Sequence, residues 1–146
     1  MTRPFRFTLA KVLEYREQAE DQAQMALSQA RLRLQQQQEL VARLESDMVV
    51  CQSKMAESTM TQADLWLWSG WRKSLEREKQ QAEAALVDLE KLVETRRREL
   101  VVKSTDRKLL DKLRIKQRQK HEQNEQHKEQ NEFDESATLR HGRAHN

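Results

Sequence analysis

Four histidines and one cysteine are the residues of this chain best suited to metal or nucleophilic chemistry. His141 and His145 are four residues apart, a spacing that puts two imidazoles on one side of a helix. Gly142 interrupts that segment, and no cysteine or carboxylate completes a ligand set. Cys51 lies on an apolar row, and no nucleophile motif or glycine-rich phosphate loop is present. The sequence therefore predicts no catalytic residue, no metal and no cofactor, and hence no enzyme or small-molecule substrate.

The basic residues gather in one segment that could bind an acidic partner. Residues 101–121 hold eight basic and two acidic side chains, and residues 122–135 hold one basic and six acidic ones. A segment with this charge could attract nucleic acid, an anionic membrane or an acidic protein surface. The acidic block beside it would repel phosphate, and no aromatic residues interleave the basic run. We therefore expect no nucleic-acid partner, although a salt-sensitive nucleic-acid binder remains an alternative.

The composition favours long helices over a globular core. Apolar residues make up 36% of the 146-residue chain and charged residues 35%, with two glycines and one proline. Few breakers leave little room for turns, and few apolar residues leave little to fill a broad core. No apolar stretch has the length of a signal peptide or a membrane span, and a single cysteine fits a reducing compartment. We expect a cytoplasmic protein.

Two apolar seams with heptad spacing organise the chain. In the second half, Leu75, Ala82, Leu86, Leu89, Val93 and Leu100 follow at intervals of 7, 4, 3, 4 and 7. In the first half, a row recurs every seven residues from Leu27 to Met55. Such spacing is typical of helices that pack along one narrow stripe. The predicted coiled-coil core comprises Leu27, Leu34, Leu44, Met48, Trp68, Trp71, Leu75, Leu86, Leu89 and Val93.

A turn between the two seams predicts an all-α, antiparallel two-helix coiled-coil hairpin. Thr61-Gln-Ala-Asp64 resembles a capping box and directly precedes the tryptophans. If the chain folds back at this turn, the residue numbers of facing core positions sum to 119 or 120, from Cys51 with Trp68 to Leu9 with Leu110. We expect a hairpin over residues 1–135, with helices at about 5–57 and 63–135, a turn at about 58–62, and a disordered tail at 136–146. The second helix overhangs the N-terminal end of the first.

The open end of this hairpin combines apolar anchors with the basic run, which favours docking over a purely structural clasp. Phe5 and Phe7 lie at that end, and the register places Phe5 opposite about residue 114. Near the turn, Trp66 lies off the seam and is either part of the packing or a partner anchor. The predicted docking residues are Phe5, Phe7, Leu9, Val12, Leu13, Lys112, Arg114, Lys116, Arg118 and Lys120.

Three stretches resemble the FliJ family, the coiled-coil component of the flagellar type III export apparatus. They are the opening FRFTLAKVLEYREQAEDQA, the middle LWLWSGWRKSLEREKQQAEAAL, and the end from DRKLLDKLRIKQRQKHEQ to KEQNEFDESA, with Phe133 as a further docking residue. The resemblance implies a stalk that docks on the export ATPase ring, contacts the membrane-embedded export gate and assists export chaperones. It also implies a location at the inner face of the cell membrane, reached through the apparatus.

Two other functions fit the same pattern. One is the equivalent stalk of a virulence-type type III secretion system, which shares the expected shape. The other is a structural rod that dimerises as one long parallel coiled coil. The turn at about 58–62 distinguishes the hairpin from that rod, because a parallel dimer needs no turn.

Overall fold

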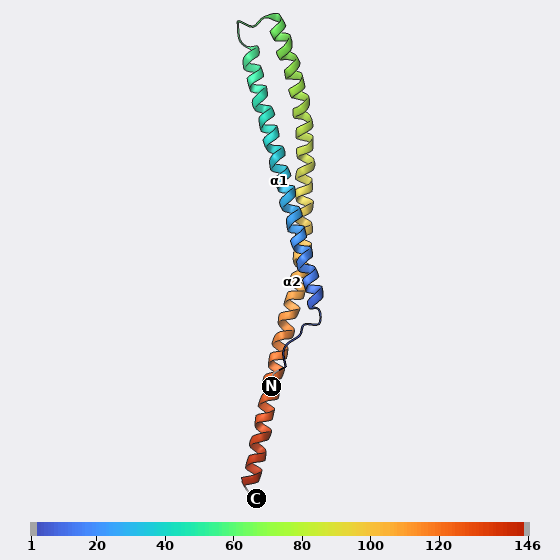
Figure 1. Cartoon of the computed structure of the whole chain (residues 1–146), viewed down its shortest axis with the longest axis vertical. Helices are drawn as coiled ribbons and strands as arrows, with labels where there is room; N and C mark the ends of the chain where they lie inside the picture. The colour runs from blue at the N-terminus through green and yellow to red at the C-terminus, as the bar shows by residue number, and fades with distance from the viewer. Residues whose placement is uncertain (1–2, 145–146) are drawn as a thin grey trace. The chain divides into compact units, whose positions relative to one another are not determined.

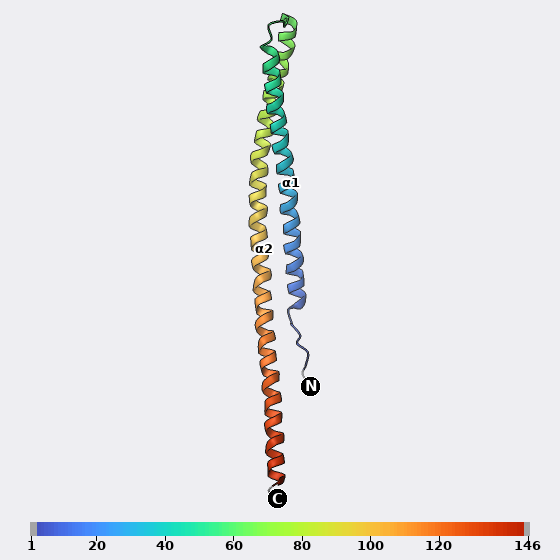
Figure 2. The same cartoon turned by 90° about the vertical axis from the view of Figure 1, so that its left-hand side faces the viewer.

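Two long helices make up the fold. The computed structural model describes residues 3–144, in which α1 spans Ala10–Met55, α2 spans Gln62–Ala144 and no β-strand occurs. The helices run antiparallel and are joined by a loop over residues 56–61 (Figure 1). The predicted all-α coiled-coil hairpin is confirmed, and α2 continues past the residue where α1 begins (Figure 2).

The hairpin divides into two compact units. The tip unit comprises residues 21–101, and the open-end unit comprises residues 1–20 with 102–146. Each unit contains a piece of both helices, so each has its own interhelical contacts.

A narrow apolar seam holds the tip unit together. Leu44, Cys51, Leu75 and Ala82 form its buried cluster, and half-buried Leu40, Val41, Met48, Met55 and Trp68 pack against it. In a pair of helices, each seam side chain is covered by the facing helix on one side only, so few positions are completely buried. The remaining predicted core residues follow this pattern: Leu27 is buried, and Leu34, Leu86, Leu89 and Val93 are half-buried.

Trp71 differs from its neighbours on the seam. It is 37% exposed and meets the half-buried Trp68 edge to face, with the ring centroids 5.2 Å apart. Trp68 fills the space opposite the small side chain of Cys51, as large-to-small core packing favours. The second indole therefore lies along the edge of the seam, and such a ring pair contributes about 0.5–1.5 kcal/mol beyond the area it buries.

Two polar contacts fix the register of the tip unit. Gln37 donates its amide to the carbonyl of Ala82 at 2.9 Å, and the Cys51 thiol donates to the carbonyl of Trp68 at 3.3 Å. Both pairs have residue numbers that sum to 119, as the sequence predicts. A slip by one heptad would preserve apolar matching but would leave these half-buried polar groups without their partners.

The start of α2 is capped. The N–H of Asp64 donates to Thr61 Oγ1 at 3.2 Å, and the N–H of Leu65 donates to the Thr61 carbonyl at 3.0 Å. The hydroxyl thus satisfies one of the free donors of the first turn, and the Asp64 carboxylate lies where the helix dipole favours negative charge.

Both helices differ from their expected lengths. α1 begins at Ala10 and not near residue 5, with the N–H of Ala10 donating to the carbonyl of Phe7 at 3.1 Å. Pro4 and the alternating phenylalanines of residues 3–9 suit an extended segment as well as a helix. At the other end, the expected disordered tail is helical as far as Ala144, and its last two residues, including His145, lie outside the described residues. Good helix formers surround Gly142, so α2 meets no strong breaker there.

Candidate docking surface at the open end

The open-end unit combines buried leucines with a polar contact between its helices. The sequence pairs Leu9 with Leu110, yet Leu9 is 37% exposed, whereas Leu13 and Leu110 are buried at 4% and 7%. Arg16 Nη1 donates to the carbonyl of Asp106 at 2.9 Å. Arg16 and Asp106 have numbers that sum to 122, and a comparable offset occurs in the tip unit, where Lys79 Nζ lies 3.8 Å from Glu45 Oε1 and the pair sums to 124. Long side chains span such offsets, so this contact is compatible with the constant of 119.

An ion-pair network crosses the two helices of this unit. The Arg107 guanidinium binds the Glu20 carboxylate, and it also approaches Asp111 Oδ2 at 3.3 Å. Asp111 Oδ1 lies 2.7 Å from Arg114 Nη2. The hydrogen bond to Glu20 raises the pKa of Arg107 above its ordinary value, so the guanidinium stays charged. The network joins α1 to α2 at positions where the apolar seam is interrupted.

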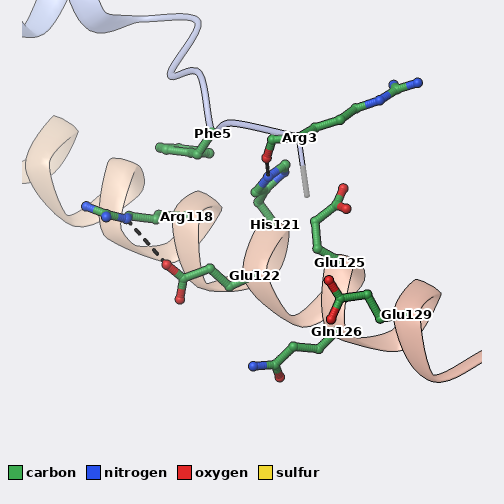
Figure 3. A pocket seen from close by; sticks show the side chains of 8 residues that line it. All are labelled: Arg3, Phe5, Arg118, His121, Glu122, Glu125, Gln126 and Glu129. Carbon is green, nitrogen blue, oxygen red and sulfur yellow. Dashed lines mark hydrogen bonds and ion pairs between the residues drawn. The ribbon is translucent and has the colours of Figure 1, made fainter. Parts of the chain in front are cut away.

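The N-terminal segment forms a clasp on α2. His121 Nε2 lies 2.8 Å from the carbonyl of Arg3, and the rings of Phe5 and His121 are 5.7 Å apart between centroids (Figure 3). Extended chain advances about 3.3 Å per residue, against about 1.5 Å in a helix. The segment therefore reaches further along α2 than a helix would, and Phe5 meets His121 and not residue 114.

A shallow hollow lies beside this clasp. Arg3 and Phe5 line it from the N-terminal segment, and α2 contributes Arg118, His121, Glu122, Glu125, Gln126 and Glu129 (Figure 3). Glu125 is only 9% exposed, and its Oε1 lies 3.9 Å from Lys128 Nζ. The clasp thus combines an aromatic contact with one hydrogen bond, and acidic side chains of α2 line the hollow beside it.

The predicted apolar docking residues fall into three groups. Leu13 is buried, Phe5 and Phe7 are half-buried, and Leu9 and Val12 are 37% and 42% exposed. Phe133 is 75% exposed on the part of α2 beyond the clasp. Leu9, Val12 and Phe133 are therefore the members of this set that a partner could reach without rearrangement.

The predicted basic docking residues also divide. Arg114 pairs with Asp111 at 2.7 Å, and Arg118 pairs with Glu122 at 3.4 Å. Within residues 3–144, no carboxylate forms an ion pair with the exposed side chains of Lys112, Lys116 and Lys120. Among the five predicted basic residues, the three lysines therefore have charge left for a partner.

Several residues of this end were missed by sequence reasoning. They are His121, Glu20, Asp106 and Asp111, none of which the sequence pattern predicts as a contact of this end. One signal was available, since Arg16 occupies a seam position and a charged seam residue requires a polar partner on the facing helix. Nothing in the local sequence marks His121 as the residue under the clasp.

Neither a metal-binding cluster nor a membrane-spanning helix occurs in the described part of the chain. No group of three or more His, Cys, Asp or Glu residues is placed to hold a metal ion there. None of the described helices has a stretch that is long and apolar enough to cross a bilayer.

Comparison with known families gives the identity of the chain. The family model described as Flagellar FliJ protein matches residues 5–146. The chain belongs to the FliJ family. This FliJ-family chain is thus a component of the flagellar export apparatus, and the resemblance noted in its sequence is confirmed. No curated protein and no solved structure matches it.

Proposed function

We propose that this FliJ-family chain is a non-catalytic stalk that docks on the export ATPase ring through its open end. The carrying observation is the exposure of Leu9 and Val12 in the same unit as Lys112, Lys116 and Lys120, which lack ion-pair partners among the described residues. Apolar anchors beside unpaired charge are typical of protein interfaces, where the anchors supply affinity and the charges supply orientation.

A link to the export gate requires a second surface. Trp66 and Leu67 of the tip unit are 77% and 62% exposed, although large apolar groups of this kind usually gain stability by burial. We assign gate contact to this pair, and an escort role for export chaperones to the same stalk. In this proposal the protein resides in the cytoplasm and reaches the inner face of the membrane through its partners.

Family membership and fold bear on the alternatives. The matching family is the flagellar one, which favours the flagellar apparatus over a virulence-type secretion system. A loop at residues 56–61 makes the chain a hairpin, whereas the alternative structural rod requires one continuous parallel helix.

The decisive experiment measures ATP hydrolysis by the cognate export ATPase with and without this chain, alongside its mass by light scattering. Stimulation by a monomeric chain is the expected result. A Leu9→Ala/Val12→Ala variant should lose stimulation while keeping its helicity, and a Met25→Ala variant, with a 63% exposed side chain in the tip unit, is the matched control. A dimer that leaves hydrolysis unchanged would contradict the proposal.

A further inference from the structure

One side of the open-end unit carries an apolar row on each helix. On α2, Val102, Leu109 and Leu113 follow at intervals of seven and four, so they lie on one row. On α1, Val12 begins a row, and Leu9 directly precedes the helix, where its carbonyl accepts from the N–H of Leu13 at 2.9 Å. We call these five residues the apolar flank.

A hydrogen bond shows that the two rows border the same groove. Arg16 lies four residues after Val12 and continues the α1 row. Its guanidinium donates to the carbonyl of Asp106, which lies three residues before Leu109 on the α2 row. Because the two rows are joined by this bond, their apolar side chains lie along one side of the helix pair.

The ion-pair network occupies a different side of α2. At about 100° per residue, Arg107, Asp111 and Arg114 lie about 100–160° around the helix from Leu113. Glu20 reaches Arg107 from α1, and Glu17 also lies close enough to act on the charge of Arg107. One side of the unit is therefore closed by ion pairs, while the apolar flank is open.

The side chains of the apolar flank are more exposed than those of a surface that another element already covers. Leu109 and Val102 are 59% and 57% exposed, Val12 is 42% exposed, and Leu9 and Leu113 are each 37% exposed. The α2 row from Val102 to Leu113 covers about 16 Å, or three helical turns. A third helix of three to four turns would match this length.

The charge around the flank selects the kind of helix. Lys116 and Lys120 continue the α2 row, and Lys112 adjoins it, all exposed and without a carboxylate partner in the described residues. Asp106 is the one acidic residue of the α2 row between Val102 and Lys120. A partner helix with carboxylates beside its apolar stripe would complement the lysines.

We propose that the apolar flank binds one amphipathic helix of a partner protein, with its apolar stripe on Leu109 and Leu113 and its carboxylates facing Lys112 and Lys116. This helix-in-groove mode uses apolar residues at intervals of three, four and seven. A second copy of the chain fits poorly, since like lysines would face each other. Nucleic acid fits poorly as well, because its phosphates do not bind apolar side chains. This inference rests on the proposed function and identifies the docking element of the export ATPase as an acidic amphipathic helix.

Photocrosslinking to the cognate export ATPase tests the flank directly. Full-length Leu109→Cys carries a benzophenone maleimide, and the control is Ile115→Cys, which is 50% exposed and lies about 120° away around α2. Cys51 is completely buried, so the introduced thiol is the accessible one. We expect crosslinks from position 109 to an acidic amphipathic helix of the ATPase, at least about tenfold above those from position 115. Loss of binding on labelling position 109 alone would support the same assignment.

Other outcomes separate the two proposals. If the ATPase binds but crosslinks equally from both positions, or from neither, the flank assignment is wrong and the docking function stands. Crosslinks at position 109 between two copies of the chain, or to a basic segment of the ATPase, overturn it as well. If the unlabelled chain neither binds nor stimulates the ATPase, the proposed function itself fails.

Charge reversal provides an independent readout. Lys112→Glu/Lys116→Glu should weaken ATPase binding about tenfold at low salt, with the difference shrinking as salt screens the charges. Lys11→Glu/Lys103→Glu makes the same charge change at two exposed residues of this unit that lie off the flank. Equal losses from both double variants would show that net charge, and not the flank, governs binding.

Discussion

Arg107 of α2 and Glu20 of α1 form an ion pair across the open-end unit, with 26% and 20% of their side chains exposed. The pair is more shielded than the surface pair of Arg98 with Glu94, whose side chains are 76% and 44% exposed. Breaking it leaves a half-buried charge without its partner.

We expect Arg107→Gln to lower the thermal midpoint of unfolding more than Arg98→Gln does, as followed by circular dichroism. The reason is that water already screens the Arg98 pair. A double variant, Arg107→Gln/Glu20→Gln, should recover part of the loss because no unpaired charge remains. Equal effects of the two single variants would mean that the interhelical pair adds nothing to stability.

Glu94 should stay ionised far into acid. Arg97 hydrogen-bonds to it at 2.7 and 3.0 Å, and this contact lowers the pKa of Glu94 from 4.5 to about 2. A lowered carboxyl pKa stabilises the fold above the unfolded value and loses that contribution as pH falls from about 4.5 towards 2. Carboxyl NMR titration should give a midpoint near 2 for Glu94, and Arg97→Gln should move it upward. If the titration midpoint of Glu94 is unchanged in this variant, a group other than Arg97 lowers its pKa.

The seam of the tip unit should be sensitive to cavities. Leu75 is 4% exposed and belongs to the buried cluster with Leu44 and Cys51. Leu75→Ala should reduce the free energy of unfolding by about 2–5 kcal/mol, measured in urea. Leu32→Ala removes the same atoms at a 55% exposed position and should cost under about 1 kcal/mol. A small loss for Leu75→Ala would show that the seam closes over the cavity.

The clasp should depend on the ring of Phe5. Its contact with His121 and the bond from His121 to the Arg3 carbonyl hold the N-terminal segment on α2. In Phe5→Ala, trypsin should cut after Arg6 several-fold faster in brief digestions read by mass spectrometry, because local opening admits the protease. Phe133→Ala removes an equal ring that is 75% exposed and should leave the rate unchanged. Identical rates in the two variants would mean that the ring contact does not hold the segment.

Trp66 gives a test of gate contact. Trp66→Ala should leave the unfolding midpoint nearly unchanged, because the side chain is 77% exposed. It should weaken binding to the cytoplasmic part of the cognate export gate, measured by calorimetry, as loss of an aromatic anchor does. Tyr15→Ala, 71% exposed in the other unit, is the control. Undiminished binding by Trp66→Ala would remove the tip from the gate interface.

The tip unit was predictable because its signals agree with one another. Heptad spacing, the Thr61 cap and the pairing of small Cys51 with large Trp68 all select one register. The Gln37 side chain adds a polar contact at the same constant of 119. Each of these features is local or periodic, which is the information that a single sequence carries.

The open-end unit was less predictable because polar residues decide its pairing. Arg16 and Arg107 interrupt the seam, and their partners lie on the facing helix, 90 and 87 residues away in the chain. The extended clasp depends on a contact between Phe5 and His121 that no periodicity reveals. A single sequence therefore carries less information about the pairing at this end than about the pairing near the turn.

The buried thiol near the turn has a practical consequence. Cys51 is completely buried and donates to a carbonyl on the facing helix, so reagents can reach it only when α1 and α2 part near the loop. Its alkylation rate therefore measures how often the two helices separate near the loop, in the native protein and without an added probe. A partner that slows this alkylation when it is added is one that holds the helices together at the tip.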